Sequence, residues 1–335
     1  MDIRLLGTDD IPQAMALWKE AFGDSDAFIA WYFENKVKAG SSLGLFEAGA
    51  LISVLHMIPY TISVQGRHLQ TAFIAGAATS KQRQGQGHMR LLLHESLVLL
   101  KSRGITMTHL YPFKHEFYEK FGWSAYSYVM RQTVTDAVYR HSSADVVETL
   151  DASVFKKLYD RMMRGYDGFV VRDDREWQWR LEELAVDGGL GAVLIADGAA
   201  RAYMLYYIED GKAQVIETVY TFEEDIGILL GYILSQGCRS ATYTVPSSGP
   251  GAEKFGMARI VDAQALLAAM GAEALLDKVE ITDGFAAWNN IKNGSGESLD
   301  IAALAALVHR GMDKNMPEKA NRFFTPQRAC IFETY

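Results

Sequence analysis

The clearest pattern of hydrophobic and polar positions lies between residues 73 and 100. Residues 73–77 are apolar, as expected for the end of a buried strand. After a polar stretch, apolar residues recur at helical spacing, at Met89, Leu92, Leu93, Leu97 and Leu100. The pattern predicts a strand, a tight polar loop and an amphipathic helix, in that order.

The predicted loop has the features of a phosphate-binding turn. Gly85 and Gly87 allow the backbone to turn freely and to approach a ligand closely. The first amides of the following helix have no partner within the helix, and such a helix end attracts phosphate. A dinucleotide fingerprint would need a third glycine at Arg90, and a P-loop would need Gly-Lys-Ser/Thr, so neither of these motifs fits.

The residues before the loop predict an antiparallel meander. An edge strand is expected at residues 3–5, and residues 8–10 offer an N-cap for the helix that follows. The next strands are expected at residues 43–47, 50–59, 60–64 and 70–77, with turn residues and Pro59 between them.

Residues from about 140 to 260 predict a second unit with a similar order of elements. A helix is expected from Asp173, and a hairpin around Asp197-Gly198. A third strand, a helix and a fourth strand follow at residues 214–219, 222–236 and 240–245. No Gly-x-Gly sequence precedes this last helix, so we expect no cofactor in the second unit. Three acidic residues could face an acceptor site, although a solvated face is the favoured interpretation: Glu217, Glu223 and Glu224.

Residues from about 260 onward predict a small third unit. A helix is expected to open at Asp262, and residues 278–282 and 285–290 read as a hairpin. An alanine-rich helix is expected at residues 299–308.

Composition limits the class of protein. With 335 residues, 49% of them hydrophobic, the chain can form two or three cores. No signal sequence follows Met1 and no apolar run approaches the roughly 20 residues of a bilayer span, so we expect a cytoplasmic protein without a membrane partner. The net charge of −8 argues against a nucleic-acid partner and suits a cationic one. Cys238 and Cys330 give neither a disulfide framework nor metal-ligand spacing.

Two motifs together carry a family resemblance. The spacing Gln82-x-x-Gly85-x-Gly87 resembles the pyrophosphate loop of the GNAT superfamily of acetyltransferases. Downstream, residues 117–123 (Phe-Tyr-Glu-Lys-Phe-Gly-Trp) are similar to the Phe-Tyr-x-x-Phe-Gly-aromatic motif that closes the acetyl-coenzyme A (acetyl-CoA) site in many members. Alone, either motif would equally suit packing, as a glycine-rich turn or an aromatic anchor. At this distance from each other they favour a cofactor site.

The order of the three units resembles the Eis-type (enhanced intracellular survival) N-acetyltransferases of this superfamily. The resemblance implies an α/β (α+β) chain with two GNAT-type acyltransferase folds in tandem and a small C-terminal domain similar to sterol carrier proteins. The predicted domains are 1–135, an N-terminal GNAT domain with the acetyl-CoA loop; 136–258, a second, degenerate GNAT-like domain; and 259–335, the sterol-carrier-like domain.

The resemblance also implies roles for single residues, with acetyl-CoA as co-substrate. Its acyl arm would lie along the backbone of Ala75, Gly76 and Ala77. Its pyrophosphate would bind residues 83–88, namely Arg83, Gln84, Gly85, Gln86, Gly87 and His88. Phe113 and Lys114 would lie beside the thioester. The family loop is often rich in arginine, whereas Gln82 and Gln84 flank a single arginine here, so backbone amides would carry more of the phosphate binding.

Catalysis would then use general acid and base chemistry without a metal. Tyr118 takes the family position of the general acid, and the carboxylate of Tyr335 takes that of the general base. No Asp or Glu occurs between Val64 and Lys81, where many GNAT enzymes carry the base, so His68 and water are the alternatives.

The acceptor is expected to be a small cationic amine: a polyamine, an aminoglycoside-like cation or a lysine. Residues 21–33 combine acidic and aromatic side chains, and four of them could hold such an amine by charge and cation–π contact: Asp24, Asp26, Trp31 and Phe33. The alternative for these residues is a capped helix with core aromatics.

Three functions therefore remain open at the level of sequence. The first is direct transfer of an acetyl group from acetyl-CoA to the amine. The second is an aminoacyl or peptidyl transferase, which would need a basic surface. The third is a non-catalytic acyl-CoA or lipid-binding protein. A homo-oligomer is compatible with the sequence, although no coiled-coil heptads demand one.

Overall fold

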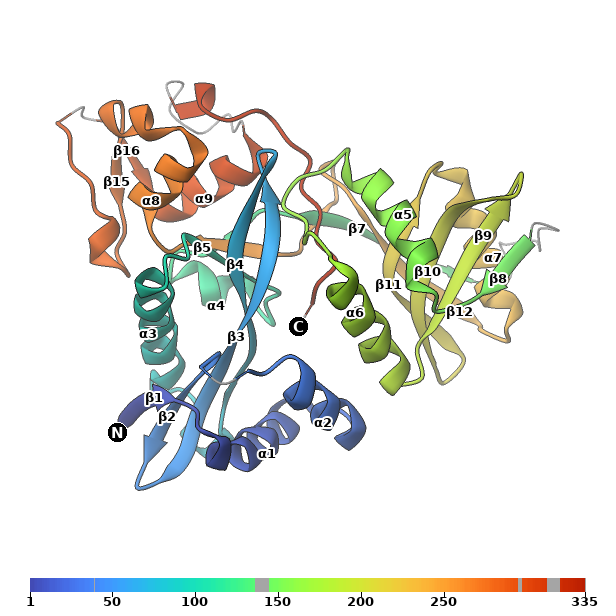
Figure 1. Cartoon of the computed structure of the whole chain (residues 1–335), viewed down its shortest axis with the longest axis horizontal. Helices are drawn as coiled ribbons and strands as arrows, with labels where there is room; N and C mark the ends of the chain where they lie inside the picture. The colour runs from blue at the N-terminus through green and yellow to red at the C-terminus, as the bar shows by residue number, and fades with distance from the viewer. Residues whose placement is uncertain (39, 136–144, 295–296, 312–319, 335) are drawn as a thin grey trace. The chain divides into compact units, whose positions relative to one another are not determined.

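The computed structural model describes residues 1–38, 40–135, 145–294, 297–311 and 320–334 (Figure 1). The chain divides into two compact units. Unit 1 contains Met1–Ser127, Gly168–Val171 and Lys254–Tyr335, and unit 2 contains Tyr128–Asp167 and Arg172–Glu253. Residues 259–335, predicted as a third domain, belong to the same unit as the first sheet. Tyr335, the predicted base, lies outside the described residues.

Unit 1 is built on a seven-stranded sheet. Its strands are β1 (Asp2–Leu5), β2 (Ser42–Glu47), β3 (Ala50–Val64), β4 (Arg67–Thr79), β5 (Met107–Leu110), β6 (Ser124–Ala125) and β14 (Met257–Ile260). They are ordered β1-β2-β3-β4-β5-β14-β6. β4 and β5 run parallel, whereas the other neighbouring pairs run antiparallel. The predicted boundary at residues 258 and 259 therefore falls within β14.

The prediction that Pro59 divides two strands is wrong, because β3 continues through it. Pro59 pairs with Ala72 of β4 on one side. On the other side β2 pairs with β3 only as far as His56, so the missing N–H of Pro59 falls where β3 is an edge. The hairpin turn that follows matches the prediction: Gln65 and Gly66 both have positive φ, as a tight β3–β4 turn requires.

Helices cover both faces of this sheet. They are α1 (Ile11–Phe22), α2 (Asp26–Asn35), α3 (His88–Ser102), α4 (His115–Glu119), α8 (Ala263–Met270) and α9 (Ile301–Arg310). Short 3-10 turns are η1 (Thr8–Asp10), η2 (Lys81–Arg83), η3 (Glu273–Asp277), η4 (Ala287–Asn289) and η5 (Ala320–Arg322). On β3, Leu55 packs in the core beneath α3, whereas His56 contacts Trp18 of α1. Successive side chains point to opposite faces, so α1 and α3 lie on opposite sides.

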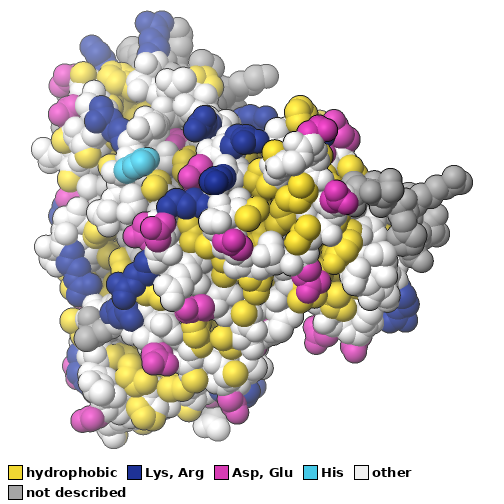
Figure 2. Space-filling model, turned by 45° about the vertical axis from the view of Figure 1, so that its right-hand side comes forward, with side chains coloured by type: hydrophobic (Ala, Val, Ile, Leu, Met, Phe, Trp, Pro, Cys, Tyr) yellow, Lys and Arg dark blue, Asp and Glu magenta, His cyan; other side chains and the backbone are white. Residues whose placement is uncertain are grey.

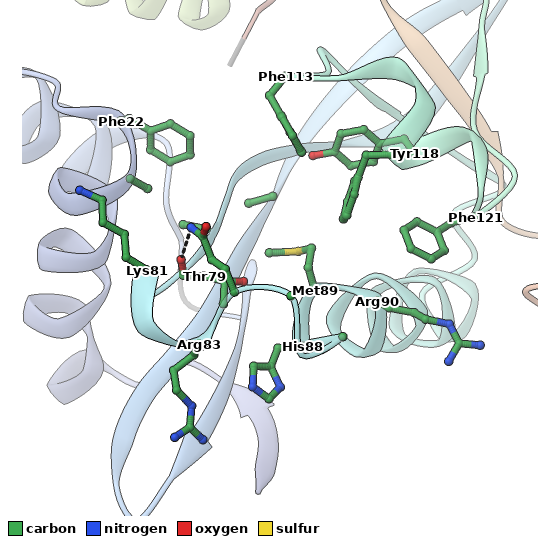
Figure 3. A pocket seen from close by; sticks show the side chains of 17 residues that line it. Phe22, Thr79, Lys81, Arg83, His88, Met89, Arg90, Phe113, Tyr118 and Phe121 are labelled. Carbon is green, nitrogen blue, oxygen red and sulfur yellow. Dashed lines mark hydrogen bonds between the residues drawn. The ribbon is translucent and has the colours of Figure 1, made fainter.

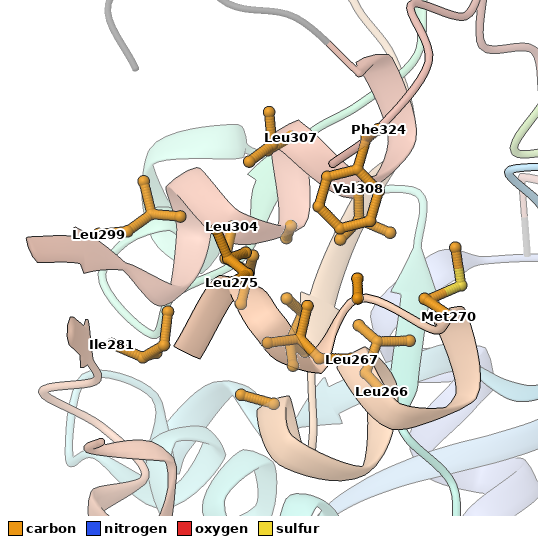
Figure 4. Packing of buried hydrophobic residues seen from close by; sticks show 14 of the residues in the cluster. Leu266, Leu267, Met270, Leu275, Ile281, Leu299, Leu304, Leu307, Val308 and Phe324 are labelled. Carbon is orange, nitrogen blue, oxygen red and sulfur yellow. The ribbon is translucent and has the colours of Figure 1, made fainter. Parts of the chain in front are cut away.

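The C-terminal residues share a hydrophobic core with the first sheet. In Figure 4, apolar side chains of α8 and α9 meet one another and Phe324. The same core contains Ile62 of β3, Met107 of β5 and Ile260 of β14. This shared core explains why residues 254–335 form one unit with the N-terminal sheet.

The predicted hairpin at residues 278–290 is reduced to one antiparallel bridge between Ile281 and Ile291, just beyond the predicted second strand. β15 (Glu280–Thr282) pairs in parallel with β16 (Ser298–Asp300). Residues 287–289 form η4 instead of a strand. The reason is a side-chain turn: Asp283 accepts hydrogen bonds from the backbone N–H groups of Phe285 and Ala286, each at 3.0 Å, which competes with a sheet ladder.

Unit 2 repeats the mixed α/β arrangement. Its sheet has the order β13-β7-β12-β11-β10-β9-β8. These strands are β7 (Tyr128–Thr135), β8 (Asp145–Glu148), β9 (Leu190–Ala196), β10 (Ala199–Glu209), β11 (Lys212–Tyr220), β12 (Ser240–Pro246) and β13 (Glu253–Lys254). The helices are α5 (Ala152–Met163), α6 (Asp174–Val186) and α7 (Glu224–Ser235). The helix after Asp173 and the hairpin at Asp197-Gly198 are confirmed.

A buried cluster of charged residues lies inside unit 2. Both guanidinium ends of Arg172 donate to the Glu217 carboxylate at 2.8 and 2.9 Å. Arg180 and the Tyr203 hydroxyl also donate to Glu217. The expectation of a solvated Glu217 is therefore wrong, because three donors replace water around its carboxylate.

Basic and acidic side chains are intermixed on the face shown in Figure 2. No helix in the described ranges is long and apolar enough to span a bilayer.

Candidate active site

A cavity of about 660 Å³ lies in unit 1 between the end of α1, the end of β4, the first turn of α3 and α4 (Figure 3). Its lining residues are Ala21, Phe22, Ala77, Ala78, Thr79, Lys81, Arg83, Gln84, Gly85, Gly87, His88, Met89, Arg90, Phe113, Phe117, Tyr118 and Phe121. Both sequence motifs therefore contribute to one cavity.

β4 separates from β5 as it approaches this cavity. The two strands pair only at Ala72 with Thr108 and at Phe73 with His109. Within the described strands, residues 74–79 of β4 have no ladder partner on the β5 side. Unpaired backbone N–H and C=O groups of a strand edge can bind an extended ligand.

β4 also carries a β-bulge beside the cavity. Val54 pairs with Ala78 and His56 pairs with Ala75, so β4 has one more residue than β3 in this interval. Gly76 has a φ of 55°, and a Cβ atom there would lie 2.3 Å from Cζ3 of Trp18. Gly76 is thus the residue that allows the bulge. Of the three residues predicted along the acyl arm, Gly76 and Ala77 form the bulge and Ala75 pairs with His56 directly before it. Ala77 also lines the cavity.

The loop after β4 turns through two glycines. Gly85 and Gly87 have φ of 75° and 82°, and nothing lies within 4 Å of where their Cβ atoms would be. Gly87 is the N-cap of α3 and provides no side-chain cap. The Gln84 side chain donates to the Thr79 carbonyl at 3.1 Å, drawn as a dashed line in Figure 3. The first amides of α3 are therefore left for a ligand beside the cavity.

The polar side chains of the loop are mainly basic. The cavity lining includes Lys81, Arg83 and Arg90 but no Asp or Glu. Arg83 pairs with Glu47, which neutralises part of its charge. His88 is 3% exposed, and neither ring nitrogen has a hydrogen-bond partner among the described residues. A basic lining with an unpartnered imidazole suits an anionic ligand.

Tyr118 lies at the α4 side of the cavity. Its ring packs against Phe113, Phe117 and Trp123, with centroid distances of 5.9, 5.1 and 6.1 Å. Burial raises the pKa of Tyr118 to about 12. The hydroxyl group therefore stays protonated at neutral pH and can donate a hydrogen bond or a proton.

The four residues predicted to bind the acceptor do not line this cavity. Asp24 accepts a hydrogen bond from the Trp18 indole at 2.7 Å, and Asp26 forms an exposed ion pair with Lys19 at 3.0 Å. Phe33 is buried against Trp18, and Trp31 lies on the same helix. Ser25 caps that helix by accepting from the Phe28 amide.

The structure separates some predicted residues from the cavity and adds others. Gln86, Lys114 and His68 do not line it. Sequence reasoning missed Phe22, at the end of α1, and Arg90, on the first turn of α3. Phe22 is 48% exposed directly before Gly23, whose φ of 78° ends the helix. The sequence did contain a signal for Phe22, namely an aromatic residue at the end of a predicted helix. The described residues bring together no group of three or more His, Cys, Asp or Glu side chains that could hold a metal.

Comparison with known proteins agrees with this geometry. Residues 2–126 match the family described as acetyltransferase (GNAT) domain. The bulged strand, the glycine loop and Tyr118 all lie within the matched residues.

Several solved structures are similar in fold to this chain, two of those below over its whole length. A probable N-acyltransferase from Enterococcus faecalis V583 is 18% identical, with a TM-score of 0.78 over 100% of this chain and 99% of that one. Eis1 from Mycobacterium abscessus is 18% identical, with a TM-score of 0.71 over 100% of both chains. A tandem GNAT protein from the clavulanic acid biosynthesis pathway is 12% identical, with a TM-score of 0.50 over 78% of this chain and 98% of that one. No curated protein matches the chain in sequence.

These likenesses confirm the predicted fold class. The mixed α/β chain, with two seven-stranded sheets, matches tandem GNAT-like folds. The predicted similarity to an Eis protein holds at the level of the fold. The GNAT domain and its structural neighbours together support an N-acetyltransferase, as the sequence predicts.

Proposed function

We propose that this protein transfers an acetyl group from acetyl-CoA to the amine of a small acceptor. One observation carries the proposal: a single cavity extends from the uncapped N-terminus of α3 to the buried ring of Tyr118. The first end suits a diphosphate, and the second suits proton transfer. The GNAT domain supports the same chemistry.

The lining residues fit acetyl-CoA, which supplies the acetyl group as a thioester when bound. In this proposal Ala75, Gly76 and Ala77 hold the acyl arm through backbone groups, because β4 has no β5 neighbour there. The amides of residues 85–88 hold the diphosphate, with Arg83, Gln84 and His88 around them. Phe113 lies beside the thioester. Gln86 and Lys114 are proposed to act from outside the cavity lining.

Tyr118 is proposed to protonate the leaving sulfur. A thiol in water has a pKa of about 8.5, whereas burial raises the pKa of Tyr118 to about 12. The thiolate would form in the same desolvated cavity, and desolvation raises the pKa of a thiol as well. The pKa values of the tyrosine hydroxyl and of the thiol are therefore raised together, so the difference between them stays small enough for proton transfer.

The base must remove a proton from the amine before or during attack. The cavity lining contains no carboxylate. The Tyr335 carboxylate remains the proposed base, and this proposal rests only on the resemblance to Eis-type N-acetyltransferases. Water is the alternative. His68 is a weaker candidate, because it lies near the β3–β4 turn and outside the cavity lining.

The acceptor is proposed to be a small cationic amine: a polyamine, an aminoglycoside-like cation or a lysine side chain. Phe22 and Phe113 both line the cavity and are 48% and 75% exposed. Their rings can hold an ammonium group by cation–π contact. We propose this pair for the role that the sequence suggests for Trp31 and Phe33.

The test is the release of free thiol from acetyl-CoA with a panel of polyamines, aminoglycosides and lysine peptides. The expected result is amine-dependent release by the whole protein and a large loss in Tyr118→Phe. Loss of activity in a folded protein that lacks Tyr335 would support its carboxylate as the base, and unchanged activity would favour water. Cofactor binding without release for any amine would support the acyl-CoA or lipid-binding alternative.

Other expectations remain predictions. These are the domain boundaries at residues 135 and 258, the sterol-carrier-like character of residues 259–335, a cytoplasmic location and a homo-oligomer.

A further inference from the structure

The cavity wall continues into aromatic residues from the C-terminal part of unit 1. Phe121 lines the cavity, and its ring lies 4.9 Å from the ring of Phe285. The Arg90 guanidinium, also at the cavity, lies 5.9 Å from the centroid of the same Phe285 ring. Figure 3 shows Arg90 and Phe121 together at one side of the cavity, away from Phe22. Phe285 is only partly buried, so part of its ring surface is accessible.

Phe285 is held in place by a buried ion pair. Arg259 donates to Asp283 at 2.6 Å, and the two side chains are 0% and 1% exposed. Asp283 also accepts from the backbone N–H groups of Phe285 and Ala286. This turn sets the position from which the Phe285 ring projects.

The same arginine also holds Phe121. Its Nε donates to the Phe121 carbonyl at 2.8 Å, and its Nη1 donates to the Ile260 carbonyl at 2.6 Å. One buried guanidinium thus fixes both aromatic residues relative to each other. A buried ion pair whose hydrogen bonds are satisfied adds little to the stability of the fold but fixes the geometry around it. The Arg259–Asp283 pair therefore suits a role in positioning the two rings.

The chemistry of this extension points to a nucleotide. Aromatic rings stack with bases, at about 1–3 kcal/mol per base. Arginine binds phosphate through two parallel N–H donors. Arg90 forms no ion pair within the described part of the chain, so its guanidinium is available. It lies two residues beyond His88, at the helix end proposed to hold the diphosphate.

We propose that Arg90 and Phe285 bind the 3′-phosphoadenosine end of acetyl-CoA, and that Arg259 and Asp283 position them. This inference rests on the proposed function, since it assigns the nucleotide end of the same donor. Residues from the N-terminal and the C-terminal segments of unit 1 then make up one donor site. The GNAT motifs account for the diphosphate and the acyl arm, whereas Phe285 lies outside the GNAT domain.

The test compares ligands that lack successive parts of the nucleotide. Calorimetry gives the affinities of the whole protein and of its variants for CoA, dephospho-CoA and 4′-phosphopantetheine. For Phe285→Ala we expect the affinity for CoA to fall roughly 5- to 150-fold, the range that loss of base stacking implies. Its affinity for 4′-phosphopantetheine should not change. Arg90→Gln should bind CoA no more tightly than dephospho-CoA.

Matched controls come from unit 2. Phe222→Ala removes another exposed aromatic ring, and Arg175→Gln removes another guanidinium that lies over a ring, 4.9 Å from Trp179. Neither change should alter any of the three affinities. Asp283→Asn, checked for folding by circular dichroism, should reduce the preference for CoA over 4′-phosphopantetheine without changing the affinity for the latter.

Two results would overturn the inference. One is equal weakening of CoA and 4′-phosphopantetheine by Phe285→Ala, which would make Phe285 part of the cavity wall only. The other is no effect on either ligand. Thiol release measured in parallel separates this inference from the proposed function: release by a Phe285→Ala protein with unchanged affinities would sustain the function alone. Altered affinities without release in any variant would sustain the nucleotide site alone.

Discussion

Gly76 of β4 lies directly against Trp18 of α1. A Cβ atom at position 76 would be 2.3 Å from Cζ3 of Trp18 and 2.7 Å from Cδ2 of His56. The indole is itself fixed, because it donates to Asp24 and is 1% exposed. The bulge in β4 therefore depends on the absence of a side chain at Gly76, because the fixed indole of Trp18 leaves no space for one.

Gly76→Ala should disrupt the site. The methyl group meets Trp18 and His56, and the φ of 55° is strained for alanine. Overpacking costs about 1–3 kcal/mol, so we expect a loss of that size in the free energy of unfolding, measured in urea. The affinity for CoA should fall as well, because the bulge must shift to relieve the contact.

Gly66→Ala is the matched control for this change. Gly66 also has a positive φ, of 71°, but nothing lies within 4 Å of where its Cβ would be. It should show backbone strain without a clash, and its affinity for CoA should stay that of the parent protein. Equal effects of the two substitutions on CoA binding would contradict the role given to the bulge.

The sequence predicted the local elements of the site well, because their signals are local. Gly85 and Gly87 mark the loop, and the helical spacing from Met89 to Leu100 marks α3. The same reasoning failed at Pro59, where the outcome depended on how far β2 extends beside β3. It failed again after Asp283, where a side-chain turn replaced the expected strand. Both errors came from contacts between distant residues or from hydrogen bonds that a hydrophobic pattern does not encode.

The same limit applies to the cavity. Phe22 and Tyr118 are 96 positions apart, and only the packing of α1 and α4 around β4 brings them to one cavity. Glu217 looked like a surface residue because its partners, Arg172 and Arg180, lie on other elements. Charge patterns along a chain do not reveal a pair formed across a fold.

Tyr118→Phe should lower kcat with little change in fold. Loss of a general acid typically costs 10²- to 10⁴-fold, so we expect kcat to fall by roughly that factor while KM for acetyl-CoA stays the same. Steady-state kinetics of thiol release measures both. Tyr206→Phe is the control: this tyrosine in unit 2 is also buried and lacks a hydrogen-bond partner in the described ranges, so its removal should leave kcat unchanged.

Tyr118 should make the protein less stable as the pH rises above about 10. Burial raises its pKa to about 12, above the value of about 10 in an unfolded chain. A raised pKa gives stability that is fully present below pH 10 and is lost as pH rises from about 10 to 12. The difference in unfolding free energy between the parent and Tyr118→Phe should therefore shrink across this range. A constant difference would argue against a buried, protonated hydroxyl.

Glu217 should make unit 2 sensitive to acid. Burial alone would raise the pKa of this carboxyl group, but Arg172 and Arg180 lower it to about 2. A depressed pKa gives stability that is present above the unfolded value of about 4.5 and is lost as pH falls toward 2, a loss of roughly 3 kcal/mol. Acid unfolding followed by circular dichroism measures this loss.

Glu217→Gln tests the same cluster at neutral pH. It removes the carboxylate charge that Arg172 and Arg180 contact, so we expect a loss of roughly 3–5 kcal/mol in unfolding free energy. Glu224→Gln, in the first turn of α7, is the control for removing one exposed acid. A flat acid profile for the parent protein would show that the cluster contributes little.

His88→Leu should separate ligand binding from stability. The imidazole is buried, and both its nitrogens lack partners in the described part of the chain, so an apolar side chain of similar size should not destabilise the fold and could stabilise it by about 1 kcal/mol. If the imidazole binds the diphosphate, the affinity for CoA should fall roughly 10- to 150-fold, since a hydrogen bond to a charged group contributes about 1.5–3 kcal/mol. Opposite signs in urea unfolding and in calorimetry are the expected outcome. A fall in both would mean that His88 has a structural partner, and unchanged affinity would leave the phosphate to the backbone amides of α3.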